Sequence, residues 1–178
     1  NVDAMTQTLG LLRPEAVRAA ASLMMGADKV LCMGQGGSMI LAQEAAHLFA
    51  TALPNFFPVV DSHIQAMLTA QLTRRDVVLY FSYSGSTKEL LDNLKIARER
   101  GAGVILITRF PKSPGAAYAD VVLQCGSHEG PFQGGSVAAR IAQLYVVDVL
   151  FSELCRRDLE GCRERRELVA EVLSDKHI

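Results

Sequence analysis

The sequence lacks any apolar run long enough to cross a membrane. None of its apolar stretches reaches the roughly 18 uncharged residues that a transmembrane helix needs. The chain also does not open with a basic segment followed by an apolar one, which is the pattern of a secretory signal. We therefore expect a soluble, cytoplasmic protein that makes no contact with a membrane.

An excess of positive charge is missing as well. The 18 Lys and Arg residues are balanced by 19 Asp and Glu residues, which gives a net charge of −1, whereas nucleic-acid binding usually needs a concentrated basic face. One basic cluster is interleaved with acidic residues, which is typical of a solvated helix face with internal ion pairs. Its members are Arg156, Arg157, Arg163, Arg165 and Arg166, set among Asp158, Glu160, Glu164 and Glu167. We expect no contact between this chain itself and DNA.

Cysteine pairs of the kind that bind zinc do not occur. The four cysteines, Cys32, Cys125, Cys155 and Cys162, include no CxxC pair, and two of them lie in or beside apolar strand-like runs. This pattern favours reduced thiols in the core over a zinc site or disulfides. We predict neither a metal nor a cofactor.

What the sequence does contain is an alternation of apolar strands and amphipathic helices. At 178 residues and 49% hydrophobic content, the chain suits one compact domain. Apolar runs rich in β-branched residues predict strands at 29–34, 56–60, 77–82, 103–108 and 121–125. Helical periodicity predicts helices at 14–27, 38–52, 62–71, 86–100, 136–154 and 158–175.

Strands and helices in alternation imply parallel strands joined by crossover helices. The fold class is therefore α/β: a three-layer α/β/α sandwich with a central, mostly five-stranded parallel sheet. We divide the chain into an N-terminal linker and helix (1–27), a ligand-binding domain (28–155) and a C-terminal helix packed on that domain (156–178). In such sheets ligands bind beyond the carboxyl ends of the strands.

The first strand is followed by the glycine-rich loop "MGQGGSM" at 33–39. Gly34 and Gly36 match the first two positions of a dinucleotide-binding GxGxxG, and Asp61 ends the next strand, where a ribose-binding acid is placed in that motif. The third glycine position holds Met39, which is too bulky for the close helix packing that the motif serves. A nucleotide site stays open but is weakened by this residue.

The second loop, "SYSGST" at 82–87, carries four hydroxyls around Gly85 at a predicted helix N-terminus. Hydroxyls and free backbone amides can satisfy the three acceptor oxygens of a phosphate monoester without a buried cation. The alternative is that Ser86 or Thr87 only caps the helix, with Glu89 completing a capping box. That alternative explains one or two of the hydroxyls and leaves the others without a role.

With these loops the chain resembles a SIS domain, the sugar isomerase fold that binds phosphosugars, over about residues 28–155. The resemblance implies that Ser82, Ser84 and Thr87 hold the phosphate, that Gly85 allows the turn, and that Ser38 lines the same pocket. We add Ser86 to the phosphate group, and Gly36 and Gly37 to the residues around the sugar.

Residues 108–151 are similar, more narrowly, to the effector-binding half of RpiR-type bacterial transcription regulators. The similarity lies in the "PKSP" turn, the "EGPF" loop and the helix that begins "SVAARIAQL". It implies a phosphosugar sensor in which Glu129, Ser136 and Arg140 contact the sugar, although Arg140 is also compatible with a subunit interface. In that family an N-terminal helix-turn-helix reads DNA. This chain starts abruptly at Asn1 without it, so we expect an excised effector domain.

A free-standing phosphosugar isomerase is the alternative function. Isomerisation needs a base to move a proton between adjacent carbons, and the candidates are Glu44, His47, His63, His128 and Glu129. Glu44 and His47 lie one helical turn apart and are read as a hydrogen-bonded pair, while Glu129 is placed to bind sugar hydroxyls. We therefore predict no catalytic residue and a sensor rather than an enzyme.

The helix at 136–154 is apolar on more than one face. Val137, Ile141 and Val147 belong to one stripe, and Tyr145 and Val149 belong to another. One stripe suits the sheet and the other suits a partner, so we expect a homodimer or homotetramer.

Overall fold

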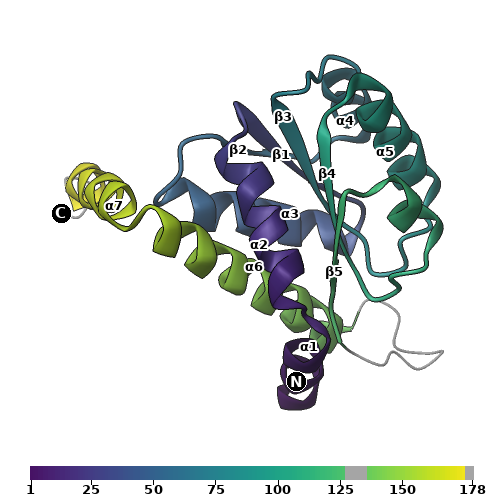
Figure 1. Ribbon diagram of the computed structural model, residues 1–178, viewed down its shortest axis with the longest axis horizontal. Coiled ribbons are helices and arrows are strands. Elements are labelled where there is room, and N and C mark those ends of the chain that lie inside the picture. Colours follow the sequence, from purple (N-terminus) through teal and green to yellow (C-terminus); the bar gives the residue numbers. More distant parts are fainter. Residues whose placement is uncertain (127–135, 175–178) are drawn as a thin grey trace.

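A computed structural model, which describes residues 1–126 and 136–174, shows a five-stranded sheet in which every strand pairing is parallel (Figure 1). The strand order is β2-β1-β3-β4-β5. The strands are β1 (Lys29–Gly34), β2 (Phe56–Val59), β3 (Asp76–Phe81), β4 (Gly103–Thr108) and β5 (Val121–Gln124). The predicted sheet is confirmed.

Helices cover both faces of the sheet, which confirms the three-layer sandwich (Figure 1). One face carries α4 (Ser62–Thr69) and α5 (Lys88–Arg100), and the other carries α2 (Pro14–Met25), α3 (Gly37–Ala50) and α6 (Val137–Arg157). The remaining helical segments are α1 (Val2–Leu11), the 3₁₀ helix η1 (Pro114–Tyr118) and α7 (Leu159–Ser174).

The two faces of the sheet belong to separate cores, because successive side chains of a strand point to opposite sides. In β3, Val77, Leu79 and Phe81 pack toward α2, α3 and α6. Val78 and Tyr80 pack toward α4 and α5. All six residues of β3 are buried, as a central strand of a parallel sheet requires.

Two segments differ from the sequence prediction. Residues 2–11 form α1, which packs against α6, and residues 114–118 form η1 beneath the end of β4. The second apolar stripe of α6 is thereby partly covered: Tyr145 and Val149 lie with Leu9 and Leu12 around a hollow between α1, α2 and α6. The second apolar stripe of α6 therefore faces helices of the same chain over part of its length.

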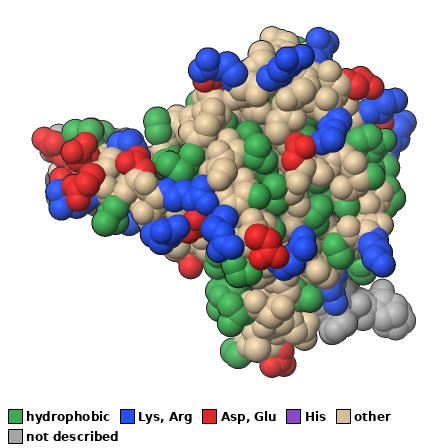
Figure 2. Space-filling model, in the orientation of Figure 1, with side chains coloured by type: hydrophobic (Ala, Val, Ile, Leu, Met, Phe, Trp, Pro, Cys, Tyr) green, Lys and Arg blue, Asp and Glu red, His purple; other side chains and the backbone are tan. Residues whose placement is uncertain are grey.

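The last helix, α7, extends away from the body of the molecule, and Figures 1 and 2 show it as a projecting arm. Its buried residue is Cys162. The arginine cluster forms ion pairs along α6 and α7, some of them with the predicted acidic residues and two with Glu153, which was not predicted from the sequence. They are Arg156 and Arg157 with Glu153, Arg163 with Glu160 and Glu167, and Arg165 with Asp158.

The cysteines are free thiols; Cys32, Cys125 and Cys162 are buried and Cys155 is half-buried. Burial raises the pKa of the Cys32 thiol far above its usual range. Among residues 1–126 and 136–174, no helix is both long and apolar enough to span a bilayer.

Candidate functional site

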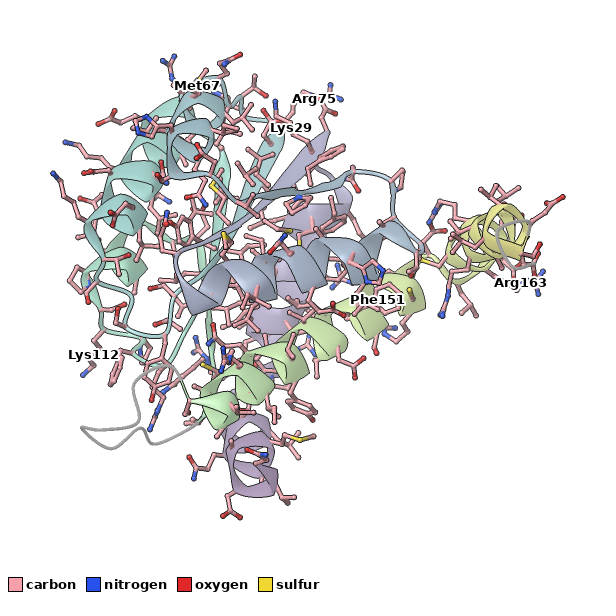
Figure 3. The ribbon with its side chains drawn as sticks, turned by 180° about the vertical axis from the view of Figure 1, so that it is seen from behind. Lys29, Met67, Arg75, Lys112, Phe151 and Arg163 are labelled. Atoms are coloured by element: carbon pink, nitrogen blue, oxygen red, sulfur yellow. The ribbon has the colours of Figure 1, made fainter. Side chains whose placement is uncertain are left out.

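The site lies where the strand order of the sheet reverses. From β1 the chain goes to one side to form β2 and then returns to place β3 on the other side of β1. Loops that leave β1 and β3 therefore diverge and open a crevice at the carboxyl ends of the strands. Figure 3 shows this polarity: Lys29 and Arg75 lie at the amino end of the sheet and Lys112 lies at the opposite end.

The register of β1 and β3 brings the two predicted loops together. Gly34, the last residue of β1, pairs with Phe81, the last residue of β3. The loops that follow enclose a cavity of about 190 Å³, which we call the hydroxyl cavity. Among the described residues it is lined by Gln35, Ser38, Phe81, Ser82, Tyr83, Ser84 and Thr87.

The hydroxyls of Ser82 and Ser84 accept hydrogen bonds from the loop's own backbone. The amide of Gly85 donates to Ser82 Oγ at 3.1 Å, and the amide of Ser86 donates to Ser84 Oγ at 3.3 Å. Each hydroxyl is thereby fixed in position as an acceptor, while its O–H remains able to donate. A pair of fixed O–H donors suits an anion.

The Thr87 hydroxyl, which belongs to a residue lining the same cavity, does not cap α5. Thr87 is the N-cap residue, but its side chain accepts no hydrogen bond from the helix amides. Thr87 therefore does not form the capping box that is the alternative interpretation of this loop, and the amides of the first turn of α5 remain available to an anion. Ser86 is exposed and does not line the cavity.

Gly85 is confined by the turn that follows β4. Its φ is +63°, and a Cβ added there would stand 2.1 Å from Ser113 Oγ. The amide of Gly115 also donates to the carbonyl of Gly85 at 2.8 Å. The "PKSP" turn thus packs against the "SYSGST" loop at 82–87, which we call the hydroxyl loop. Only glycine fits between the turn and this loop.

The first glycine loop uses its glycines for backbone geometry, while the acid of the nucleotide motif has a structural role. Gly34 is required because a Cβ there would stand 2.6 Å from the carbonyl oxygen of Ser38, and Gly36 has a φ of +54°. Asp61, the candidate ribose ligand, instead caps α4: its Oδ1 accepts from the amide of Ile64 at 2.9 Å. The carboxylate is therefore already engaged in a structural role.

Gln35, in the middle of that loop, is held by a buried polar network. Its Nε2 donates to Gln65 Oε1 at 2.7 Å and lies 3.4 Å from the Tyr80 hydroxyl. Gln65 also accepts from Asn93 and donates to the carbonyls of Gly34 and Val59. Burial raises the pKa of Tyr80, so its hydroxyl keeps its proton. The network fixes Gln35 at the rim of the hydroxyl cavity.

A second cavity of about 100 Å³ adjoins the first; we call it the α6 cavity. It shares Gln35, Ser38 and Tyr83 with the hydroxyl cavity, and its other described lining residues are Gly37, Leu41, Ser136, Ala139, Arg140 and Gln143. Ser136 caps α6 by accepting from the amide of Ala139 at 3.1 Å. Glu129, the remaining predicted sugar ligand, lies outside the described residues, as does His128.

No Asp, Glu or His occurs among the described residues that line the two cavities. Glu44 and His47 form a surface pair, with His47 Nδ1 4.0 Å from Glu44 Oε2, and both side chains are exposed. Within residues 1–126 and 136–174 there is also no cluster of three or more His, Cys, Asp and Glu side chains that could hold a metal.

Larger hollows occur elsewhere among the described residues, but they lack the two loops that the sequence identifies. One of about 450 Å³ lies between α1, α2 and α6, one of about 500 Å³ lies at the α6–α7 joint, and one of about 520 Å³ lies beside β5. None lies at the carboxyl ends of β1 and β3, and none contains a glycine loop or a row of hydroxyls. Size alone therefore does not locate the site.

Three of the lining residues that carry polar side-chain groups were not singled out by the sequence: Gln35, Tyr83 and Gln143. Gln35 and Tyr83 lie inside the two loops that the sequence did identify, so their positions were a usable signal. Gln143 lies on an apolar helix, one turn after the predicted ligand Arg140, and its neighbours in the sequence are those of a buried core position.

The fold and the site together define a parallel α/β domain with a hydroxyl-lined crevice at the switch point of its sheet. The sequence profile of the SIS domain matches residues 23–153. The chain belongs to the SIS domain family.

Relatives indicate the context in which this domain occurs. The chain is 33% identical, over all of its length and 63% of the relative's, to an uncharacterised HTH-type transcriptional regulator of Caldanaerobacter subterraneus. It is 32% identical to the HTH-type transcriptional regulator RpiR of Escherichia coli over 127 residues, 71% of this chain and 43% of RpiR. The chain thus spans less than two thirds of these curated relatives.

Among solved structures, the Vibrio vulnificus NanR protein complexed with ManNAc-6P matches with a TM-score of 0.94 at 26% identity. The match covers 99% of this chain and 67% of that one. Structures described as phosphosugar isomerases share the fold at lower identity.

Proposed function

We propose that this chain is the phosphosugar-binding sensor domain of an RpiR-type transcription regulator. The observation that carries the proposal is the hydroxyl loop: Ser82, Ser84 and Thr87 line one cavity at the N-terminus of α5. The similarity to NanR, which was solved with a phosphosugar, supports the same assignment.

Phosphate recognition in the proposal uses neutral donors. Ser82 and Ser84 offer O–H groups that the backbone holds in place, and the first turn of α5 offers amides and the positive end of a helix dipole. We assign the phosphate to the hydroxyl cavity and the sugar to the α6 cavity, next to Gly36, Gly37, Ser38, Ser136 and Arg140. Glu129 is proposed as a further sugar ligand from the family resemblance.

The test is a thermal-shift panel of sugar phosphates, each paired with the same sugar without phosphate. A ligand at about 100 times its dissociation constant is expected to stabilise the domain by roughly 2.7 kcal/mol. We expect this gain from some phosphorylated sugars and none from their unphosphorylated partners. Equal shifts within each pair would contradict the assignment.

We further propose that the domain binds its ligand without converting it. The described lining residues offer no carboxylate or imidazole to move a proton between carbons. Each stabilising ligand is to be incubated with the domain in deuterated water. Protein-dependent deuterium incorporation beside the carbonyl carbon, lost in Glu129→Gln, would establish the isomerase instead.

We assign DNA binding and a cytoplasmic location to the whole regulator. The relatives are HTH-type regulators, and this chain spans about 60% of their length. We therefore propose that the regulator contacts DNA through a helix-turn-helix outside these 178 residues. The even charge balance of the chain agrees with that division of roles.

We also propose that two copies of the domain associate through α7. This arm exposes Leu168 and Val172, which lie one helical turn apart on the same face of α7, and an apolar face on a helix that projects from its domain is suited to pairing with a second copy. Light scattering that gives the mass of a monomer at micromolar concentration would contradict this proposal.

A further inference from the structure

Gln143 is a buried side chain with an unused acceptor. Only 2% of the residue is exposed, on the first turns of α6. Its Nε2 donates to the carbonyl of Ala139 at 3.3 Å, while its Oε1 receives no hydrogen bond in the described structure. Reversing the amide would place two carbonyl oxygens against each other, so the hydrogen-bond pattern fixes Oε1 as the unpaired atom.

The position of Gln143 makes this acceptor informative. The residue borders the α6 cavity, together with Gln35, Ser38 and Tyr83, which also line the hydroxyl cavity. A buried acceptor without a donor is costly, and native proteins rarely keep one that has no role. A donor group of a bound molecule would remove that cost.

Arg140 lies one helical turn before Gln143 and borders the same cavity. One of its guanidinium nitrogens is 3.8 Å from the point where a Cβ would stand on Gly37. Within the described part of the chain, Arg140 forms no ion pair. The α6 cavity therefore combines a cationic donor with a neutral acceptor.

We propose that Gln143 Oε1 accepts a hydrogen bond from a sugar hydroxyl or amide N–H, and so selects ligands that carry a donor next to their phosphate-bearing end. The inference rests on the proposed function, since it takes the phosphate to be held in the hydroxyl cavity. Arg140 then donates to an oxygen of the same sugar. The ligand class is a polyhydroxylated or acylamino sugar phosphate, and a bare phosphate group makes only half of the contacts.

The inference can be tested with Gln143→Met, which keeps the side-chain length and removes the acceptor. The control is Gln71→Met, because Gln71 makes the same kind of bond, from Nε2 to the carbonyl of Met67 at 3.2 Å, but is exposed on another face. Calorimetric titration is to use glucose 6-phosphate, glucosamine 6-phosphate, N-acetylmannosamine 6-phosphate and ribose 5-phosphate, with inorganic phosphate as the reference.

We expect Gln143→Met to weaken the best of these sugar phosphates about tenfold, as the loss of one hydrogen bond to a neutral acceptor implies. Inorganic phosphate should bind the variant and the wild type within about twofold, and Gln71→Met should bind every probe as the wild type does. The melting temperature of unliganded Gln143→Met should stay level or rise, because an unpaired acceptor has been removed.

Two results overturn the inference, and they are distinguishable. If the wild type binds a sugar phosphate and Gln143→Met binds it equally well, Gln143 does not read the sugar while the proposed function stands. If the wild type binds none of the four sugar phosphates, the proposed function fails together with the inference. A lowered melting temperature with unchanged affinity would show Gln143 to be structural.

Discussion

At the scale of single residues, the two glycines with positive φ in the site loops have different reasons to be glycine. At Gly36 the φ is +54° and a Cβ would meet nothing within 4 Å. At Gly85 the φ is +63° and a Cβ would stand 2.1 Å from Ser113 Oγ and 3.1 Å from Thr108 Oγ1. Gly36 is needed for backbone conformation alone, and Gly85 is needed for both conformation and space.

Substituting these glycines by alanine separates the two effects. Gly36→Ala should cost about 1–3 kcal/mol, because its φ of +54° and ψ of −126° lie in a region that residues with a Cβ rarely adopt. Gly85→Ala should cost roughly 3 kcal/mol or more, because overpacking adds to the same strain. Urea unfolding of both variants measures the difference. Equal losses would mean that the turn at 111–113 moves away freely and does not support the loop.

The sequence could predict the hydroxyls of the site but not the glutamine side chains around them. Ser82, Ser84 and Thr87 stand out because they are clustered at a strand end. The bond between Gln35 and Gln65 joins residues 30 positions apart, and no local pattern reports such a pair. Gln143 sits at helical spacing among apolar residues, where only the packed structure shows that its oxygen lacks a donor.

At the scale of elements, Glu153 on α6 is connected to α2 through Arg157. Its carboxylate accepts from Arg156 and Arg157, and Arg157 in turn donates to Ser22 Oγ and the carbonyl of Arg18 on α2. These two guanidinium groups hold the pKa of Glu153 at about 2, below its ordinary value of 4.5.

The lowered pKa predicts a pH-dependent effect of Glu153→Gln. A carboxyl whose pKa is depressed in the folded state stabilises it above its ordinary pKa, and this stabilisation is lost as the pH falls from about 4.5 to about 2. The variant should therefore be less stable than the wild type at pH 7, by about 1 kcal/mol for a partly exposed pair, and the two should converge near pH 2.

Glu160→Gln is the matched control for that experiment. Glu160 pairs with Arg163 at 3.2 Å, but both side chains are well exposed, so its removal should change stability little. Chemical unfolding at a series of pH values compares the two variants. A loss for Glu153→Gln that is the same at pH 3 and pH 7 would exclude the carboxylate as its source.

Most elements of the fold could be predicted, because long periodic segments report buried faces directly. The strands were found within one or two residues at their ends, and the helices of the two outer layers were found as well. The short helix α1 was missed, since its apolar residues contact α6 only in the folded chain. The η1 segment was not predicted, because the sequence points only to the "PKSP" turn before it and the strand after it.

At the scale of the whole molecule, the topology explains why two separate loops make one site. The sheet order places β1 beside β3, and their paired ends set a glycine loop against a hydroxyl loop. In the proposed function each loop has its own part, because one offers donors for the phosphate and the other borders the space for the sugar. The arm α7 lies at a distance from this crevice in Figure 1, so association through it would leave the site open.

The most direct measurement is the affinity of one stabilising sugar phosphate for the wild type, Ser84→Ala and Ser86→Ala, by calorimetric titration. Ser84 lines the hydroxyl cavity and Ser86, two residues further on in the same loop, does not. The account predicts that Ser84→Ala weakens binding about tenfold or more, as a charge-assisted hydrogen bond implies, and that Ser86→Ala binds as the wild type does. Equal affinity for Ser84→Ala and the wild type would contradict the claim that this loop holds the phosphate.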